Sequence, residues 1–510
     1  MGCFYLIKKV CVLAIVMIFG LLCVVSAENS YHLAGFEGDS DNRQWSSGLF
    51  FTRWSELFDL ELTLTQYSNY ADWQKEIGRY LTGAELPDAL IKAELSAADT
   101  LALYEKGIII DLKPLIHEYM PNLFALLTEF PQWEHAITLP NGAIAALPGL
   151  TDITTNNAMW INQKWLDVLR LEVPTDRESF ERVLAAFKSM DPNRNGKQDE
   201  IPFGFLGVWD LKFLAHAFGL IANDYNLFVD VDGVVRHIAY QPEFRNFVLW
   251  LTDLYAKGLL DPGGFVSSDT IRQMSDANAP LVYGMFLSSS PVNIMPQQDT
   301  SGYEVLMPFV FNQQQTYREL TGNVARGAFA ITSACQNPKK LLSAIDYFYC
   351  DAGAMLAQAG VENVEYSVNE EGLWMWITDD TNDIASVIKR ATIADGGAFP
   401  YYQSAQSMLR FADESVQKQI RQLYDLSNVC VMPYPLVVLN NETQNTADTL
   451  QLKLGAIFET YIGRCVLGQI TLDDASWNGF LSDLDHNSIQ ELIDIFQTVL
   501  DNQTGSALHE

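Results

Sequence analysis

One loop of the sequence carries the oxygen atoms that a calcium ion needs. Residues 191–200 are Asp-Pro-Asn-Arg-Asn-Gly-Lys-Gln-Asp-Glu, in which side-chain oxygens alternate with residues that turn the chain. Calcium prefers six to eight hard oxygen ligands, which such an alternation supplies. The expected ligands are the side chains of Asp191, Asn193, Asn195, Asp199 and Glu200 and the backbone carbonyl of Lys197, with Gly196 at the sharp turn.

This loop departs from an EF-hand at its end. Position twelve, where a bidentate Glu usually closes the site, is Pro202, so Glu200 must close this one. Residues 201–205 have the pattern of a strand, so no second helix is available to open a groove when calcium binds. We therefore expect a structural ion. The alternative is a polar turn without metal, which residues such as Asn, Asp and Gly also form.

Motifs for enzymatic catalysis are weak. No Ser lies in a Gly-x-Ser-x-Gly motif, and the seven His residues have no metal-ligand spacing. His135, His216 and His237 are expected at the surface or as satisfied core groups. The 63 acidic residues make chance carboxylate pairs inevitable, so a glycosidase or lyase stays open as an alternative to a binding protein.

The N-terminus predicts export. Lys8 and Lys9 precede the apolar run 10–25, and the sequence Val-Ser-Ala at 25–27 fits a cleavage site, so residues 1–27 are expected to be a signal peptide. A retained membrane anchor is the alternative. Lipidation of Cys23 is not favoured because large residues, Leu21 and Leu22, precede it. The protein is expected to be secreted or held at the extracellular face of the membrane.

Length and charge describe the remaining chain. Removing residues 1–27 of 510 leaves about 480, enough for two lobes. It then holds 30 basic and 63 acidic residues, a net charge of −33, which should repel nucleic acid and anionic membranes. Four cysteines lie outside the signal peptide with no metal or redox spacing, and we expect free thiols although export permits a disulfide: Cys335, Cys350, Cys430 and Cys465.

Strand patterns alternate with helix patterns along the chain. Strands are expected at 60–65 and 87–91 and helices at 73–81 and 338–358. A capping box of Thr175 and Glu178 should start a helix that stops near Met190, and Asn337 should cap the helix at 338. A last helix starts at Ile489 and frays from Gln503. This alternation predicts α/β lobes.

Several stretches, in this order, resemble the extracellular solute-binding proteins of carbohydrate ABC importers, particularly the alginate-oligosaccharide binders and long lipoprotein-type sugar binders. The most specific are 159–166, 173–175 and 191–202; weaker ones are 82–88, 112–123, 338–347 and 360–366. The resemblance implies a type II periplasmic-binding-protein fold, with two α/β lobes joined by a multi-strand hinge. It also places the calcium loop in the second lobe, away from the ligand.

The resemblance implies that lobe one comprises 28–150 and 309–366, and lobe two 151–308 and 367–510. The chain should pass from one lobe to the other three times, near 148–157, near 308–312 and after Tyr366. An oligosaccharide would bind in the cleft between the lobes, which close on it, and pass to the membrane permease subunits of an importer. A monomer without enzymatic activity is expected. A peptide-binding or sensor-coupled protein on the same fold is a further alternative.

Sugar rings need flat aromatic platforms and polar groups that pair their hydroxyls. Trp165 and Trp250 fall at helical spacing and are expected in the core. Candidates follow strands or approach the expected crossings: Arg43, Trp45, Trp209, Phe286, Tyr401 and Tyr402, with Glu85 and Asp88 as hydroxyl acceptors. The alternatives are that the aromatic residues pack within the lobes and that Asp88 caps a helix. With Arg43 alone, no basic cluster for an acidic sugar is evident.

Overall fold

The computed structural model describes most of the chain beyond the predicted signal peptide. The described residues are 29–38, 43–154, 156–266, 281–295, 299–319, 323–370, 372–379, 383–393, 398–410 and 414–507. The signal peptide expected at 1–27 lies outside them. In this part of the chain, no helix combines the length and the apolar character needed to cross a bilayer.

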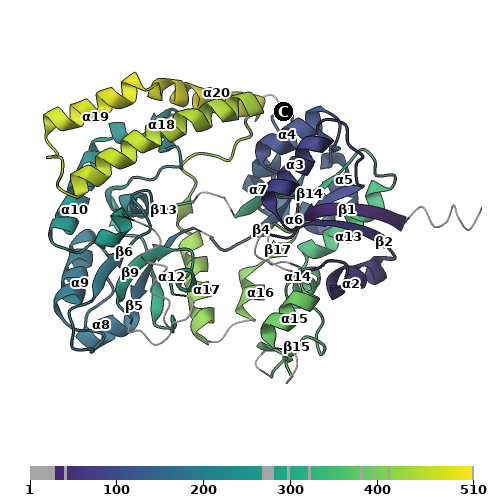
Figure 1. The fold of residues 1–510 in the computed structure, drawn as a ribbon, viewed down its shortest axis with the longest axis horizontal. Helices are drawn as coiled ribbons and strands as arrows, with labels where there is room; N and C mark the ends of the chain where they lie inside the picture. Colours follow the sequence, from purple (N-terminus) through teal and green to yellow (C-terminus); the bar gives the residue numbers. More distant parts are fainter. Residues whose placement is uncertain are drawn as a thin grey trace, which may run out of the picture. The chain divides into compact units, whose positions relative to one another are not determined.

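The chain forms two compact units. Unit 1 comprises residues 1–150 and 324–403, and unit 2 comprises 151–323 and 404–510, so three chain segments connect them. Both units combine helices with a sheet (Figure 1). The predicted α/β class with two lobes is thereby confirmed.

Unit 1 is built on a six-stranded mixed sheet of order β17-β4-β14-β3-β1-β2. Its strands are β1 (Ser30–Phe36), β2 (Glu61–Tyr67), β3 (Ala89–Ile91), β4 (Leu147–Thr151), β14 (Val324–Ile331) and β17 (Tyr402–Gln403). β1 runs parallel to both β2 and β3, whereas β14 runs antiparallel to β3 and β4. In the sheet, β2 lies on one side of β1 and β3 lies on the other. The strand order of the parallel part therefore reverses at β1.

Helices surround this sheet because each carries an apolar stripe that must be buried. They are α2 (Leu49–Phe58), α3 (Tyr70–Tyr80), α4 (Ala97–Glu105), α5 (Lys113–Tyr119), α6 (Pro121–Glu129), α7 (Pro131–Ile137), α13 (Pro338–Asp346), α14 (Asp351–Gln358) and α15 (Ile384–Ala391), with the hairpin β15 (Tyr366–Val368) and β16 (Trp374–Trp376). Asn337 caps α13 as expected, since its side chain accepts the Lys340 amide.

Unit 2 has a four-stranded sheet of order β10-β5-β9-β6. Its strands are β5 (Ala158–Asn162), β6 (Ile201–Gly204), β9 (Tyr283–Ser288) and β10 (Tyr303–Leu306). Smaller pairs are β7 (Leu227–Val229) with β8 (Val235–His237), β11 (Val310–Phe311) with β12 (Gln314–Gln315), and β13 (Tyr317–Arg318) with β18 (Cys430–Val431). Trp165 and Trp250 belong to the core of this unit, as expected.

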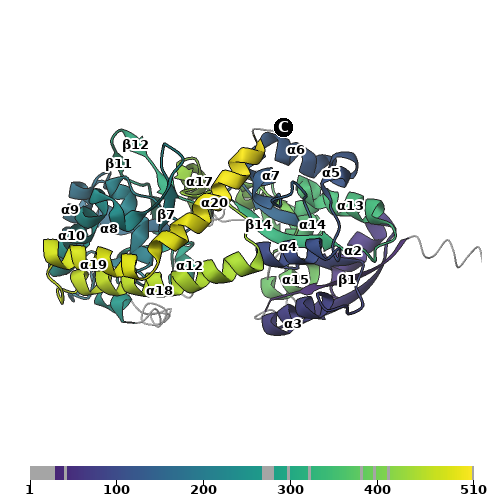
Figure 2. The same cartoon turned by 90° about the horizontal axis from the view of Figure 1, so that it is seen from above.

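The helices of unit 2 include a long C-terminal group. α18 (Asn441–Val466), α19 (Asp474–His486) and α20 (Ile489–Ala507) lie side by side (Figure 1, Figure 2). The others are α8 (Gln163–Leu169), α9 (Arg177–Ser189), α10 (Pro242–Ala256), α12 (Pro291–Ile294), α16 (Ala405–Leu409), α17 (Glu414–Ser427) and the 3-10 helices η2 (Asp210–Phe218), η3 (Ile238–Tyr240) and η4 (Pro262–Phe265). The four cysteines beyond the signal peptide are free thiols, as predicted.

The structure corrects the expected second and third crossings. The second follows Asn323 rather than 308, because β13 pairs with β18 and so keeps residues 317–318 in unit 2. The third follows Gln403 rather than Tyr366, because β17 adds to the sheet of unit 1. The first, between Leu150 and Thr151, falls inside the expected range.

Two expected helix details also differ. The capping box of α9 is formed by Asp176 and Ser179 instead of Thr175 and Glu178, because the extended residue Asp176 accepts the Ser179 amide. The helix expected over 338–358 is interrupted by a 3-10 turn at 347–349 and an extended Cys350. The apolar spacing continues through this break, so the sequence pattern did not show it.

Candidate functional site

A buried ion pair lies at the carboxyl edge of the sheet in unit 1. Glu37 directly follows β1 and Lys92 directly follows β3, and these strands are parallel neighbours. Lys92 Nζ lies 3.0 Å from Glu37 Oε1, and both side chains are 0% exposed. In open α/β sheets ligands bind beyond the carboxyl ends of the strands, where the strand order reverses. The pair therefore occupies the edge where a ligand surface is expected.

The same carboxylate interacts with two other groups. It accepts a hydrogen bond from the Trp45 indole Nε1, and Arg43 Nε lies 3.7 Å away. Burial raises the pKa of Glu37, against the opposing effects of Lys92, Trp45 and Arg43. Lys92 also donates to the Ile393 carbonyl at 2.9 Å. This cluster thus ties the strand ends to loop 43–45 and to the end of α15.

Arg43 and Trp45 were expected to contact ligand directly, and the structure places them otherwise. Only 3% of Arg43 and 2% of Trp45 is exposed. Arg43 donates to the Thr392 carbonyl at 2.6 Å, and the Trp45 ring packs 5.2 Å from Phe51. Because protein covers the Trp45 ring, it has no free face for a sugar, and both residues instead anchor the edge of the sheet.

Glu85 and Asp88 lie at the amino end of β3, on the opposite side of the sheet from the carboxyl ends that carry the Glu37 cluster. Both precede β3, whereas the Glu37 cluster follows β1 and β3. Glu85 is exposed. Asp88 Oδ2 accepts the His32 amide at 2.7 Å, so this carboxylate pins neighbouring strands and does not cap a helix. The structure does not bring these two acids together with Arg43 and Trp45.

Tyr401 and Tyr402 are half-buried at the end of unit 1, just before the last crossing. The Tyr401 hydroxyl lies 3.2 Å from Gln403 Oε1 and its ring 5.8 Å from Phe399. The ring of Tyr402 lies 5.9 Å from that of Trp133. Each tyrosine keeps part of its surface accessible, so both stay candidates for ligand contact.

Trp209 is the exposed aromatic residue of unit 2 that fits a platform. It is 41% exposed and lies in the loop between β6 and η2. A Cβ built on Gly207 would lie 2.7 Å from its indole nitrogen, so the ring rests directly on the backbone of its own loop. An indole that is exposed to solvent on one face and packed against backbone on the other is suited to stack on the apolar face of a sugar ring.

Asp210, the next residue, was not anticipated. Its side chain is 0% exposed, and it accepts hydrogen bonds from Asn157 Nδ2 at 2.9 Å and from the Leu206 amide at 3.1 Å. Burial raises the pKa of Asp210 to about 7, although these hydrogen bonds and Arg318 act in the opposite direction. The only hint in the sequence is an acid between Trp209 and Leu211, where the neighbours are apolar.

Further buried polar residues lie on the two chain segments of unit 2 that adjoin unit 1 in sequence, after Leu150 and before Val324. Arg318 is 3% exposed, donates to Asp224 at 2.9 Å and places its guanidinium 4.6 Å from the Phe213 ring centre. Thr154 donates to Glu319 at 3.0 Å. Buried polar groups of this kind fix the loops of a site in one arrangement.

Phe286 is wrong as a ligand candidate. It lies in the middle of β9, of which every residue is buried, and it is 1% exposed. Its ring packs 4.9 Å from that of Tyr303. The strand continues beyond the position where the sequence suggested a loop, so this side chain belongs to the core.

The loop at 191–200 is held by its own side chains. Asp191 accepts the amides of Asn195 and Gly196 at 3.0 and 2.9 Å, and Asn195 Nδ2 donates to Asp199 at 2.9 Å. Gly196 has φ 74° in the left-handed region, which permits the turn. Residues 201–204 form β6, as expected for a loop that no second helix follows.

The residues of this loop fit a cation in their chemistry. Glu200 Oε1 is buried and has no hydrogen-bond partner in the described part of the chain. Burial, together with the charges of Asp191 and Asp199, raises the pKa of Glu200. Within the described ranges, no group of three or more His, Cys, Asp or Glu side chains is arranged to hold a metal. The side-chain oxygen of Asn195 accepts the Lys197 amide at 2.8 Å, and its second lone pair is available in principle to a cation.

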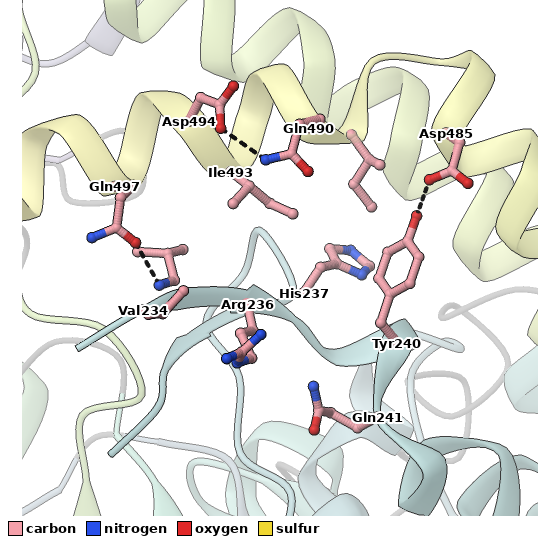
Figure 3. Close-up of a pocket in the computed structure, with 12 residues that line it drawn as sticks. Val234, Arg236, His237, Tyr240, Gln241, Asp485, Gln490, Ile493, Asp494 and Gln497 are labelled. Atoms are coloured by element: carbon pink, nitrogen blue, oxygen red, sulfur yellow. Dashed lines mark hydrogen bonds between the residues drawn. The ribbon is translucent and has the colours of Figure 1, made fainter. Parts of the chain in front are cut away.

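A separate pocket of about 520 Å³ lies between β8, η3 and the last two helices (Figure 3). Six of its lining residues form hydrogen bonds with one another. Tyr240 donates to Asp485, Gln490 donates to Asp494 at 2.8 Å, and Gln497 accepts the Val235 amide at 2.8 Å. The first of these bonds joins η3 to α19, the second lies within α20, and the third holds α20 on β8, so these groups serve the packing of the C-terminal helices.

Solved structures show which class of fold these units form. An extracellular solute-binding protein from Bifidobacterium longum subsp. infantis is 17% identical, with a TM-score of 0.74 over 93% of this chain and 98% of that protein. The alginate-binding protein AlgQ2, solved without calcium ion, is 18% identical, with a TM-score of 0.63 over 94% and 99%. The chain therefore has the fold of the solute-binding proteins, which confirms the predicted type II periplasmic-binding-protein fold.

One relative is also similar in sequence. It is the fructooligosaccharide ABC transporter substrate-binding protein FusA of Streptococcus pneumoniae, 32% identical over 299 residues, which cover 56% of this chain and about half, 54%, of FusA. An EF-hand mutant of FusA in complex with fructo-nystose is 22% identical, with a TM-score of 0.65 over 94% of this chain and 100% of that protein. No protein-family model matches the sequence.

Proposed function

We propose that this protein is the solute-binding component of an ABC importer and captures an oligosaccharide. One observation carries the proposal: the chain is 32% identical to FusA over 299 residues and has a solute-binding-protein fold over 94% of its length. FusA is a fructooligosaccharide-binding protein of such an importer. Fructooligosaccharides are therefore the first ligands to test, and the permease subunits of the importer are the expected partners.

For the ligand contacts, we propose Trp209 in unit 2 and Tyr401 and Tyr402 in unit 1. All three keep accessible aromatic surface beside a chain crossing or a buried polar network. Sugar binding uses such rings together with hydroxyl-pairing groups. The buried Glu37 and Lys92 would support the surface of unit 1 without touching the sugar.

We also propose that the loop at 191–200 binds a structural calcium ion. The ligands would be Asp191, Asn193, Asn195, Asp199, Glu200 and the Lys197 carbonyl. The unpartnered Glu200 oxygen supports this, and one of the similar solved structures is an EF-hand mutant of FusA. The ion would neutralise the carboxylates and fix the start of β6 (Ile201–Gly204).

Export follows from the same proposal. A solute-binding protein works outside the cytoplasm, in agreement with a signal peptide at 1–27. We propose a secreted or membrane-surface protein that acts as a monomer and catalyses no reaction.

The proposal is tested by thermal shift and calorimetric titration with kestose, nystose, other neutral oligosaccharides and short peptides. A ligand present at a hundred times its Kd stabilises the folded state by about 2.7 kcal/mol. This should raise the melting temperature by roughly 5–10 °C for a unit of this size. A rise with peptides alone would refute oligosaccharide capture, and release of reducing sugar during incubation would point to an enzyme.

A further inference from the structure

The loop that presents Trp209 is fixed to the incoming chain segment through one buried carboxylate. Asn157 belongs to the segment that enters unit 2 after Leu150, and Asp210 joins it to the Leu206 amide on the far side of the same loop. The Tyr317 hydroxyl in turn donates to the Asn157 carbonyl at 2.6 Å, which holds that residue from β13. The Trp209 loop therefore cannot move without breaking a hydrogen bond to Asp210.

This arrangement is unusual for a surface loop. Trp209 is 41% exposed, whereas the neighbouring Asp210 is 0% exposed. A buried carboxylate costs free energy unless it is hydrogen-bonded, and here each Asp210 oxygen accepts one hydrogen bond. A fixed ring loses little freedom when a ligand stacks on it, which favours binding.

We propose that Asp210 is a positioning residue, whose hydrogen bonds to Asn157 and Leu206 hold the Trp209 ring in place for the sugar and thereby set the affinity. The inference rests on the proposed function, because it assumes that Trp209 stacks on an oligosaccharide. It adds a residue that does not touch the ligand.

The inference predicts a pH dependence. Ionised Asp210 offers both oxygens as charged acceptors. Protonation removes the charge and gives one oxygen a donor hydrogen, so the bonds from Asn157 and from the Leu206 amide weaken. The charged or titratable groups that face Asp210 are Arg318 and Tyr317 of β13. Since burial raises the pKa of Asp210 to about 7, affinity should fall as the pH drops from 8 to 6.

The test is the Asp210→Asn variant, titrated with kestose by calorimetry at pH 6, 7 and 8. Its amide can satisfy only one of the two donors and does not ionise. We expect about tenfold weaker binding than wild type at pH 8, the usual effect of losing a hydrogen bond to a charged group, and no change with pH. Asp485→Asn is the control, because Asp485 is a hydrogen-bonded acid of unit 2 far along the chain from the Trp209 loop.

Hydrogen exchange provides a second measurement that needs no ligand. At pH 8 the Leu206 amide should exchange at least tenfold faster in Asp210→Asn than in wild type. If that variant does not fold, Asn157→Ala removes the hydrogen bond that ties Asp210 to the incoming segment, and it should weaken kestose binding at pH 8 by a similar factor. Unchanged exchange at Leu206 overturns the inference, and so does faster exchange with unchanged affinity for kestose. Failure of wild type to bind any oligosaccharide would refute the proposed function, while exchange at Leu206 would still decide whether Asp210 fixes the loop.

Discussion

The buried ion pair of unit 1 makes a quantitative prediction possible. The Lys92→Met substitution keeps a long apolar stem but removes the ammonium group that lies 3.0 Å from Glu37. The carboxylate would stay fully buried, and the Ile393 carbonyl would lose the donor that now lies 2.9 Å away. We expect the variant to fold with clearly reduced stability.

The magnitude follows from burial. Breaking a buried ion pair by removing one partner costs about 3–5 kcal/mol. Arg43 remains 3.7 Å from Glu37, so we expect the lower end of this range, about 3 kcal/mol. Because burial already raises the pKa of Glu37 and Lys92 opposes that rise, the variant should hold a proton on Glu37 to higher pH. When folding raises the pKa of a carboxyl, the folded state loses stability as the pH rises above the pKa of that carboxyl in the unfolded chain. The loss of stability caused by Lys92→Met should therefore be larger at pH 8 than at pH 5.

Calorimetric melting of the full chain measures the effect. A loss of 3 kcal/mol corresponds to a drop of roughly 6–12 °C for a unit of about 200 residues. The matched control is Lys164→Met, whose ammonium also lies 3.0 Å from a carboxylate, Asp299, but with side chains 55% and 67% exposed. Exposed pairs contribute at most about 1 kcal/mol. Equal drops for the two variants would refute the reasoning, and the double variant Glu37→Gln with Lys92→Met should recover part of the loss because it leaves no buried charge unpaired.

Two further predictions concern the calcium loop and the aromatic platform. Chelation with EGTA should lower the melting temperature of wild type but not of Glu200→Gln, because the variant lacks the carboxylate that closes the site; an equal effect on both proteins would contradict a role for Glu200. Trp209→Ala should weaken oligosaccharide binding about tenfold in calorimetric titration, by loss of a stacking face. Tyr240→Ala removes a ring of similar exposure, 39% against 41%, and should leave the affinity unchanged; weakening by both would point to a general effect of losing surface aromatics.

Features that depend on local sequence were predicted well. The turn at Gly196, the cap at Asn337 and the C-terminal end of α9 follow from residues a few positions apart, and the structure has them where the pattern placed them. The same locality explains the agreement for strands β2 and β3. Hydrogen bonds within a turn or cap involve neighbours in the chain, so the sequence alone contains both partners.

Features that depend on distant partners were predicted poorly. Trp45 resembles a ligand platform until its contacts with Glu37 and Phe51 are known. Phe286 resembles one until β9 is seen to extend past it between β5 and β6. Asp210 was missed because its partner Asn157 lies 53 positions away. Burial is decided by such long-range contacts, which spacing along one chain does not reveal.

The two units use a buried carboxylate for a similar task with opposite results for the nearby tryptophan. In unit 1, Glu37 accepts the indole hydrogen of Trp45 itself, so the ring is drawn into the protein. In unit 2, Asp210 accepts a side-chain amide and a backbone amide, and the adjacent Trp209 stays exposed. What the carboxylate binds, rather than its presence beside a tryptophan, decides whether the ring becomes part of the core or stays available for a ligand. Trp209 is for that reason the stronger of the two as a sugar contact. The affinity of the protein for an oligosaccharide should then depend on whether Asp210 is ionised.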